Sequence, residues 1–163
     1  MKLARSAFAA ALLLAACTPP ATTTTSTSTT TSAVTGTTHA ASFTVNDLQE
    51  SDGNIQGCTR SLSRTGAAPS AGEIFREDGV DTGAVGFVRI DGALIAVNLV
   101  SSNGNEKGGT RTFADKANTT QIVETLTTGA AHEEADSVEE SGSLAITHNG
   151  ATQTIQVEGG TAC

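Results

Sequence analysis

Two dipeptides constrain the fold of this chain most strongly. Asp91-Gly92 and Asn149-Gly150 each separate two runs that are rich in β-branched and apolar residues. The runs are 86–90 and 93–100 around the first dipeptide, and 143–148 and 151–157 around the second. Asp-Gly and Asn-Gly favour type I′ turns, which need positive φ at both central residues and join antiparallel strands. The sequence therefore predicts two β-hairpins.

The rest of the segment 42–163 has the same character of short runs divided by turn residues. Further runs typical of strands are 42–48, 55–62, 73–76, 111–113 and 120–127. The run 93–100 is apolar on both faces in its first half, which predicts a central strand. In the last run, Gln153, Ile155 and Val157 share one face, which predicts a half-buried strand. This spacing of short strands predicts an all-β domain, either a small antiparallel sandwich or a barrel.

The stretch 130–140 fits this pattern least. It contains helix formers followed by Gly142, so a short helix is one interpretation and an exposed acidic loop is the alternative. Its ionisable residues are His132, Glu133, Glu134, Asp136, Glu139 and Glu140. Their spacing matches neither an EF-hand loop nor the H-E-x-x-H pattern of zinc sites, so we predict a solvated acidic face and no metal site.

Aromatic residues are few, and all of them are phenylalanines. The predicted domain contains Phe43, Phe75, Phe87 and Phe113, which we assign to its core because apolar aromatic side chains gain most from burial. Trp and Tyr are absent from the sequence. A domain of this composition cannot form the Trp or Tyr stacking platforms that many sugar sites and single-stranded nucleic acid sites use.

The first residues have the layout of a secretory signal peptide. Lys2 and Arg5 precede an uncharged apolar run over residues 7–16, which is too short to cross a bilayer. Residues 18–41 are almost all Thr, Ser, Ala and Pro, a composition that predicts a disordered linker. We therefore divide the chain into a signal peptide over 1–16, a cysteine with its linker over 17–41, and a β-domain over 42–163.

The junction Leu14-Ala15-Ala16-Cys17 resembles the lipobox of bacterial lipoproteins. The resemblance implies cleavage before Cys17 and attachment of diacylglycerol and palmitate chains to that residue. More than one acyl chain holds a protein stably on a membrane. In lipoproteins of enteric-type bacteria, an aspartate after the cysteine favours inner-membrane retention, and Thr18 stands there in this chain. We therefore expect a cell-envelope protein anchored by lipid to the outer membrane, on its periplasmic or surface side.

Two cysteines remain besides the lipidation site. Cys58 and Cys163 form an even pair in a chain that is exported to an oxidising compartment, so we predict a disulfide bond between them. A closed loop of this length is worth about 4–5 kcal/mol in the chain-entropy model. No basic, histidine-paired setting surrounds Cys58 in the sequence, which disfavours a reactive thiol.

The charge of the chain excludes some partners. Removal of the signal peptide leaves seven basic side chains against 17 acidic ones, a balance of −10. Such a surface repels phosphate backbones, so nucleic acid is not an expected partner. The sequence shows neither a G-x-S-x-G nucleophile motif nor a phosphate-binding P-loop. We therefore expect no enzyme activity and no cofactor.

The glycine-rich segment 102–109 joins two predicted strands, and its tip is a candidate binding loop. Its polar residues are Ser102, Asn103, Asn105 and Lys107. A lipoprotein β-domain with Cys58 near its first strands and a terminal Cys163 is similar in layout to the membrane-bound lysozyme inhibitors of the bacterial periplasm. That similarity implies an antiparallel barrel that blocks a basic enzyme cleft with a loop.

Three functions follow as hypotheses from these features. The first is a non-catalytic envelope lipoprotein whose β-domain binds another envelope protein or has a structural role. The second is an inhibitor of lysozyme-type enzymes, which the acidic surface and the segment 102–109 would suit. The third is an enzyme that hydrolyses envelope polymers.

Overall fold

The computed structural model describes residues 42–163, apart from residues 54–56, 69, 81 and 106. The signal peptide, Cys17 and the linker therefore lie outside the described residues. The strands are β1 (Val45–Asn46), β2 (Thr59–Arg64), β3 (Phe75–Asp78), β4 (Val85–Ile90), β5 (Ala93–Asn105), β6 (Gly108–Ala114), β7 (Thr120–His132), β8 (Ser137–His148) and β9 (Ala151–Ala162).

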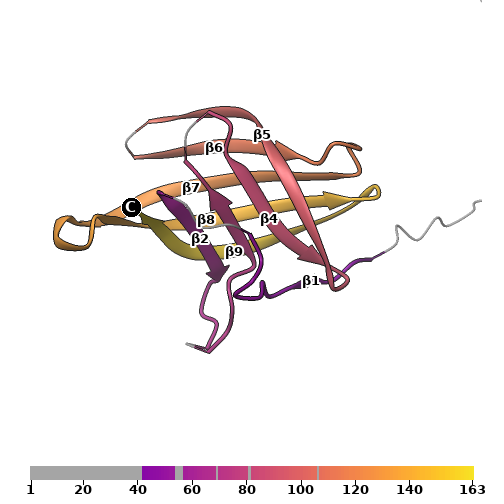
Figure 1. The fold of residues 1–163 in the computed structure, drawn as a ribbon, viewed down its shortest axis with the longest axis horizontal. Coiled ribbons are helices and arrows are strands. Elements are labelled where there is room, and N and C mark those ends of the chain that lie inside the picture. The colour runs from indigo at the N-terminus through magenta and orange to yellow at the C-terminus, as the bar shows by residue number, and fades with distance from the viewer. Residues whose placement is uncertain (1–41, 54–56, 69, 81, 106) are drawn as a thin grey trace, which may run out of the picture. The chain divides into compact units, whose positions relative to one another are not determined.

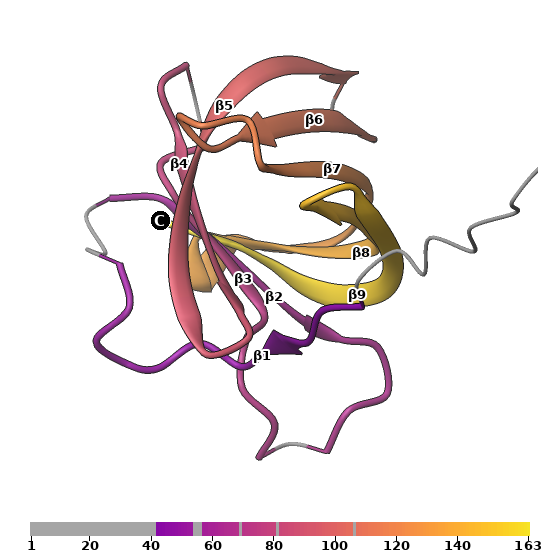
Figure 2. The same cartoon turned by 90° about the vertical axis from the view of Figure 1, so that its right-hand side faces the viewer.

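Eight of these strands form a closed antiparallel barrel. From β2 to β9 each strand pairs with the next one along the chain, and β9 pairs with β2 to close the ring (Figures 1 and 2). Strand β1 pairs with the end of β4 through Val45 opposite Ile90. The predicted all-β class is confirmed, and of the two predicted architectures the structure shows the barrel, which leaves no open edge in the ring.

Both predicted hairpin turns are confirmed. Asp91 and Gly92 have φ of 50° and 82°, and Asn149 and Gly150 have φ of 48° and 83°. These are the positive values that a type I′ turn needs and that Asn, Asp and Gly tolerate best. The turns join β4 to β5 and β8 to β9. The prediction for 93–100 holds in part, because β5 has a neighbour on each side but Leu94 on its outer face is exposed.

The disulfide bond between Cys58 and Cys163 is also confirmed. Cys58 directly precedes β2, and Cys163 directly follows β9. These are the two strands whose pairing closes the barrel. The bond therefore links the two ends of the ring, which lie 105 residues apart in the sequence.

The stretch 130–140 is neither an α-helix nor a simple loop. Strand β7 continues to His132, a single 3-10 turn covers Glu133–Ala135, and β8 begins at Ser137. The helical interpretation therefore applies to one turn only, and most of the stretch belongs to a long hairpin. In the described part of the chain, no helix has the length and apolar character that crossing a membrane requires.

The apolar core fills the middle of the barrel, and the predicted aromatic residues belong to it with one exception. Phe75 and Phe113 are fully buried, and their rings pack edge to face with centroids 5.4 Å apart. Phe43 packs partly against the same cluster. Phe87 was wrongly assigned, because it alternates with the buried Gly86 and Val88 and so lies on the outer face of β4, half-exposed.

The end of the barrel near β1 is covered by the chain itself. Val45 is buried, and its carbonyl accepts a hydrogen bond of 2.6 Å from Arg64 Nη2. The ring of Phe43 lies 5.7 Å from that of His148, and its carbonyl accepts a hydrogen bond from Gln153. The C-terminus lies at the opposite end (Figure 1). Segment 43–46 therefore closes one end, and we call the other end, near Cys163, the mouth.

Candidate functional site

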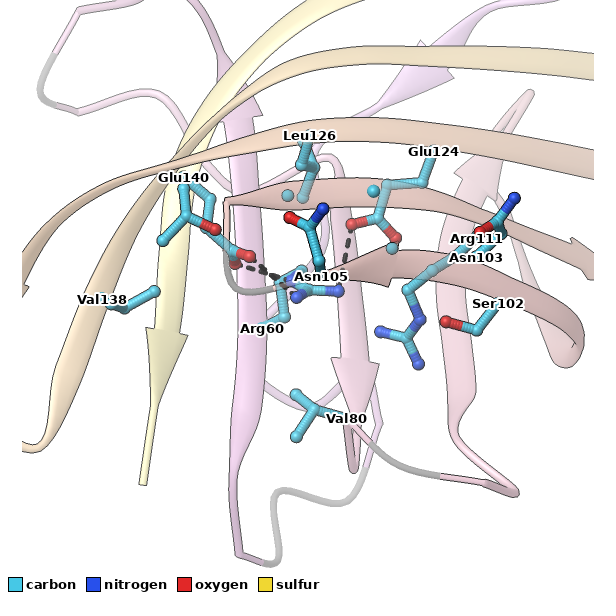
Figure 3. Close-up of a pocket in the computed structure, with 14 residues that line it drawn as sticks. Arg60, Val80, Ser102, Asn103, Asn105, Arg111, Glu124, Leu126, Val138 and Glu140 are labelled. Atoms are coloured by element: carbon cyan, nitrogen blue, oxygen red, sulfur yellow. Dashed lines mark hydrogen bonds and ion pairs between the residues drawn. The ribbon is translucent and has the colours of Figure 1, made fainter. Parts of the chain in front are cut away.

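The mouth of the barrel contains a pocket of about 440 Å³. Its polar lining side chains include Arg60, Ser102, Asn103, Arg111, Glu124 and Glu140, which come from five different strands (Figure 3). Leu126, Val80 and Val138 add apolar surface. A volume of this size lies within the range of sites for small molecules.

Strand alternation explains how charged residues reach the inside of the barrel. On each of four strands, a charged residue lies two positions from an apolar residue that faces the interior. The pairs are Leu62 and Arg60 on β2, Phe75 and Glu77 on β3, Phe113 and Arg111 on β6, and Ile122 and Glu124 on β7. A step of two residues keeps the same face and advances about 6.6 Å along the strand. These four charged side chains, together with the buried Glu140 on β8, form a charged layer next to the apolar core, which we call the mouth cluster.

Arg60 organises one side of this cluster. Its Nε and Nη2 atoms donate to the two carboxylate oxygens of Glu140 at 2.7 Å and 2.8 Å, a bidentate contact. The hydroxyl of Thr161 donates a further hydrogen bond of 2.9 Å to Glu140. Arg60 Nη1 donates to Glu77 at 3.1 Å. Glu140 therefore has its charge balanced inside the barrel.

Glu77 links the two arginines. It is completely buried and accepts hydrogen bonds from Arg60 Nη1 and from Arg111 Nη1. The guanidinium carbon of Arg111 lies 5.2 Å from the ring centroid of Phe113, which places the cation over an aromatic face. The Nε and Nη2 atoms of Arg111 have no hydrogen-bond partner. One edge of this buried guanidinium is therefore unused.

Glu124 differs from the other two glutamates of the cluster. It is 1% exposed, and neither of its oxygens accepts a hydrogen bond. Arg60 Nη1 forms an ion pair with Oε1 of Glu124 at 3.1 Å (Figure 3), and the same nitrogen donates a hydrogen bond to Glu77. Burial raises the pKa of Glu124 to about 9, together with a hydrogen bond that its acid form donates to Glu77 and with the negative charge of Glu77, although Arg60 and Arg111 oppose the shift. At neutral pH Glu124 is therefore protonated and uncharged.

The predicted binding residues lie at this mouth, although not in a loop. Ser102, Asn103 and Asn105 line the pocket, and all three belong to β5, whose hairpin with β6 is paired out to Asn105 opposite Gly108. Lys107 lies in the turn and is exposed, and it is not a lining residue. The segment 102–109 was interpreted as a connection between two strands, and most of it is instead paired strand. The binding role of these residues stays a prediction.

The predicted acidic face divides into two parts. The side chains exposed on the β7–β8 hairpin are His132, Glu133, Glu134, Asp136 and Glu139. His132 contacts Glu139 at 3.0 Å. Glu140 is not part of this face, since alternation turns it into the barrel, where Arg60 holds it. Among the described residues, no group of three or more His, Cys, Asp or Glu side chains is arranged to hold a metal ion.

Sequence reasoning missed Arg60, Glu77, Arg111 and Glu124 as members of a site. The sequence contained a pattern that could have indicated them, because each of these charged residues lies two positions from an apolar residue on the same face of its strand. The clearest case is Ile122, Glu124 and Leu126, in which a glutamate occupies the middle of an inward-facing apolar series. A charged residue in such a position is rare unless it is paired.

Comparison of the chain with models of protein families, with curated proteins and with solved structures finds no match.

Proposed function

We propose that this chain is a lipid-anchored envelope protein whose barrel binds a small polar ligand in its mouth without catalysis. The observation that carries the proposal is the pocket of about 440 Å³ with a buried charged floor. On that floor, the Nε and Nη2 groups of Arg111 have no acceptor, and the oxygens of Glu124 accept no hydrogen bond from the protein. Unused polar groups in a buried position are destabilising, so a partner that satisfies them gains affinity.

The anchor is the second part of the proposal. The lipobox at Leu14–Cys17 supports lipidation of Cys17, and Thr18 supports the outer membrane as its location. Metabolic labelling with palmitate tests this directly, since the mature protein should carry the label and partition into detergent. A mature protein without acyl chains, or one that begins upstream of Cys17, would contradict the anchor and leave the pocket unaffected.

Binding is favoured over catalysis by the state of the carboxylates. Glu77 and Glu140 each accept hydrogen bonds from guanidinium groups, which restrains them as nucleophiles or bases. Burial holds Glu124 in its acid form, which cannot act as a nucleophile or base. Hydrolysis of envelope polymers would show as turnover of peptidoglycan fragments, and such turnover would contradict this part of the proposal.

The pocket can be tested with a library of small polar metabolites and thermal unfolding. A ligand at a hundred times its Kd stabilises a protein by about 2.7 kcal/mol. We expect such a ligand to stabilise the wild type but not Val138→Trp, in which a bulky ring would fill the mouth. Ser141→Trp is the matched control, because Ser141 lies on the outer face of the same strand and is exposed. Equal stabilisation of both variants would contradict binding in the mouth.

A cationic protein partner is a second candidate, favoured by the distribution of charge. All five arginines of the described segment donate hydrogen bonds to groups of the chain itself, whereas Lys107 and Lys116 are exposed. The exposed basic side chains of the described segment are therefore the two lysines, which are set against a majority of acidic side chains. Inhibition of a basic lysozyme would be sensitive to salt and unchanged by Val138→Trp, which separates it from ligand binding in the pocket.

A further inference from the structure

We infer that the ligand of the mouth pocket carries a cationic nitrogen, an ammonium or a guanidinium group, that pairs with Glu124. This inference rests on the proposed function, since it names the chemical class of the ligand. It is carried by the arrangement of charges around Glu124 and by the position of that residue on the pocket wall.

The mouth cluster lacks one cation. The charged groups that face Glu124 are Arg60 on β2, Glu77 on β3, Arg111 on β6 and Glu140 on β8. The two guanidinium groups are matched by Glu77 and Glu140 through hydrogen bonds. Among these described side chains, Glu124 is the third carboxyl group, and it receives no hydrogen bond because Arg60, which lies at ion-pair distance, donates to Glu77 and Glu140. A cation supplied from outside would therefore complete the set.

In the absence of a ligand, a proton on Glu124 takes the place of that cation. Because burial and Glu77 hold Glu124 in its acid form, the cluster has two positive and two negative charges. When an ammonium group enters, the neutral carboxyl group becomes a carboxylate that accepts a hydrogen bond from the ammonium, and its proton passes to solvent. The charge of the cluster with its ligand is again zero, so binding and proton release are linked.

An anionic ligand fits the same groups less well. The free Nε and Nη2 atoms of Arg111 form the edge of a guanidinium that binds carboxylates in a bidentate manner. However, an anion would add uncompensated negative charge to a neutral cluster inside an acidic protein, which the field of the whole molecule opposes. We therefore assign the edge of Arg111 to an uncharged acceptor, such as a carbonyl oxygen, on the same ligand.

The test uses three probes of equal size and different charge. These are n-butylammonium, butyramide and butyrate, measured by titration calorimetry against the wild-type protein. We expect n-butylammonium to bind and the other two not to bind. Below the pKa of Glu124, the affinity for n-butylammonium should rise by up to about tenfold for each unit by which the pH is increased, because fewer protons compete with the ligand for Glu124. Measurements in buffers of different ionisation enthalpy should show release of about one proton per ligand at neutral pH, as the linkage predicts.

Two variants decide whether Glu124 is the group involved. Glu124→Gln has the shape of the neutral acid but cannot become a carboxylate, so it should lose binding of n-butylammonium and the release of protons. Glu134→Gln removes an exposed acidic charge on the β7–β8 hairpin and should bind as the wild type does. Circular dichroism and thermal unfolding confirm that both variants are folded.

The outcomes separate this inference from the proposed function. Equal binding of n-butylammonium to the wild type and Glu124→Gln would overturn the role of Glu124. Binding of butyrate or butyramide in preference to n-butylammonium, or of none of the probes, would overturn the cationic class. In each case the metabolite library with Val138→Trp still decides independently whether the mouth is a binding site.

Discussion

The two halves of the barrel use the same strands for different purposes. In the half toward β1, the inward positions are Leu62, Phe75, Phe113 and Ile122, and all four are fully buried. Two residues further toward the mouth, the same strands present charged side chains that are almost as deeply buried. Alternation therefore decides which residues face inward, whereas the choice between apolar and charged residues decides what each half does.

The energies of the two halves differ accordingly. Burial of one large apolar side chain contributes about 1.5–3 kcal/mol. A buried ion pair contributes little or is unfavourable, because the loss of hydration offsets the attraction between the charges. We infer that the apolar half supplies most of the stability, and that the mouth cluster is kept for recognition.

The disulfide bond should have the largest effect. The double variant Cys58→Ser with Cys163→Ser opens a loop of 105 residues and should lose about 4–5 kcal/mol in unfolding by denaturant. The wild type measured in reductant should show the same loss. A change below about 1 kcal/mol would contradict this prediction, because it would mean that the disulfide bond hardly restricts the unfolded chain. The pairing of β2 with β9 would then need no covalent support.

Removal of Glu77 should be nearly as severe. Glu77→Ala leaves Arg111 without its hydrogen-bond acceptor and deprives Arg60 of one, so the variant should lose about 3–5 kcal/mol. Glu133→Ala on the exposed 3-10 turn is the control and should change stability by no more than about 0.5 kcal/mol. Similar small losses in both variants would show that water reaches the mouth cluster and replaces Glu77.

These features were predictable from the sequence to different degrees. The hairpins at Asp91-Gly92 and Asn149-Gly150 could be predicted, because positive φ at two adjacent positions is a local requirement that few residues meet. The disulfide pairing could also be predicted, because the assignment of Cys17 to the lipid anchor left only Cys58 and Cys163 to pair. The position of Phe87 on the outer face of its strand could not be predicted, because an apolar residue on a short strand does not indicate which face the barrel will bury.

The mouth cluster could not be predicted because its contacts are not local. Arg60 and Glu140 are 80 residues apart in sequence, and they meet only because β2 and β8 both flank β9 in the closed ring. The same closure turns Glu140 inward, away from the exposed acidic residues beside it. The composition of the stretch around Glu140 suggested one solvated acidic face. The strand register instead decides on which side of the sheet each residue lies.

The pH dependence of stability should separate the mouth from the apolar half. The pKa of Glu124 is raised on folding from 4.5 to about 9, so between these values the folded state holds a proton that the unfolded state has lost. Stability should therefore fall as pH rises through this window, by at most about 1.4 kcal/mol per unit from this group.

Glu124→Gln removes that titration. Its stability should change less with pH than that of the wild type, and from about pH 5 to about pH 7 the difference should reach about 2–3 kcal/mol. Denaturant unfolding over a series of pH values measures both proteins. Parallel pH profiles would mean that Glu124 ionises normally inside the barrel.

A smaller effect is expected in the apolar half. A Cβ at Gly86 would lie 2.6 Å from Cζ of Phe75, so Gly86→Ala should lose about 1–3 kcal/mol through overpacking. Because the two closest atoms both belong to the ring of Phe75, with Val97 further away at 3.0 Å, Phe75→Leu in the same molecule should recover part of the loss relative to Phe75→Leu alone. Full additivity in the double-mutant cycle would show that the ring of Phe75 does not approach Gly86.

The most direct test of the account is the titration of Glu124 itself, followed by carbon NMR of its side-chain carboxyl group. We expect a midpoint near 9 in the protein without ligand. We also expect n-butylammonium to move this midpoint to lower pH, because the cation favours the carboxylate. A midpoint near the ordinary value of 4.5 without ligand, or one that n-butylammonium leaves unchanged, would contradict the central claim that the mouth cluster lacks one cation.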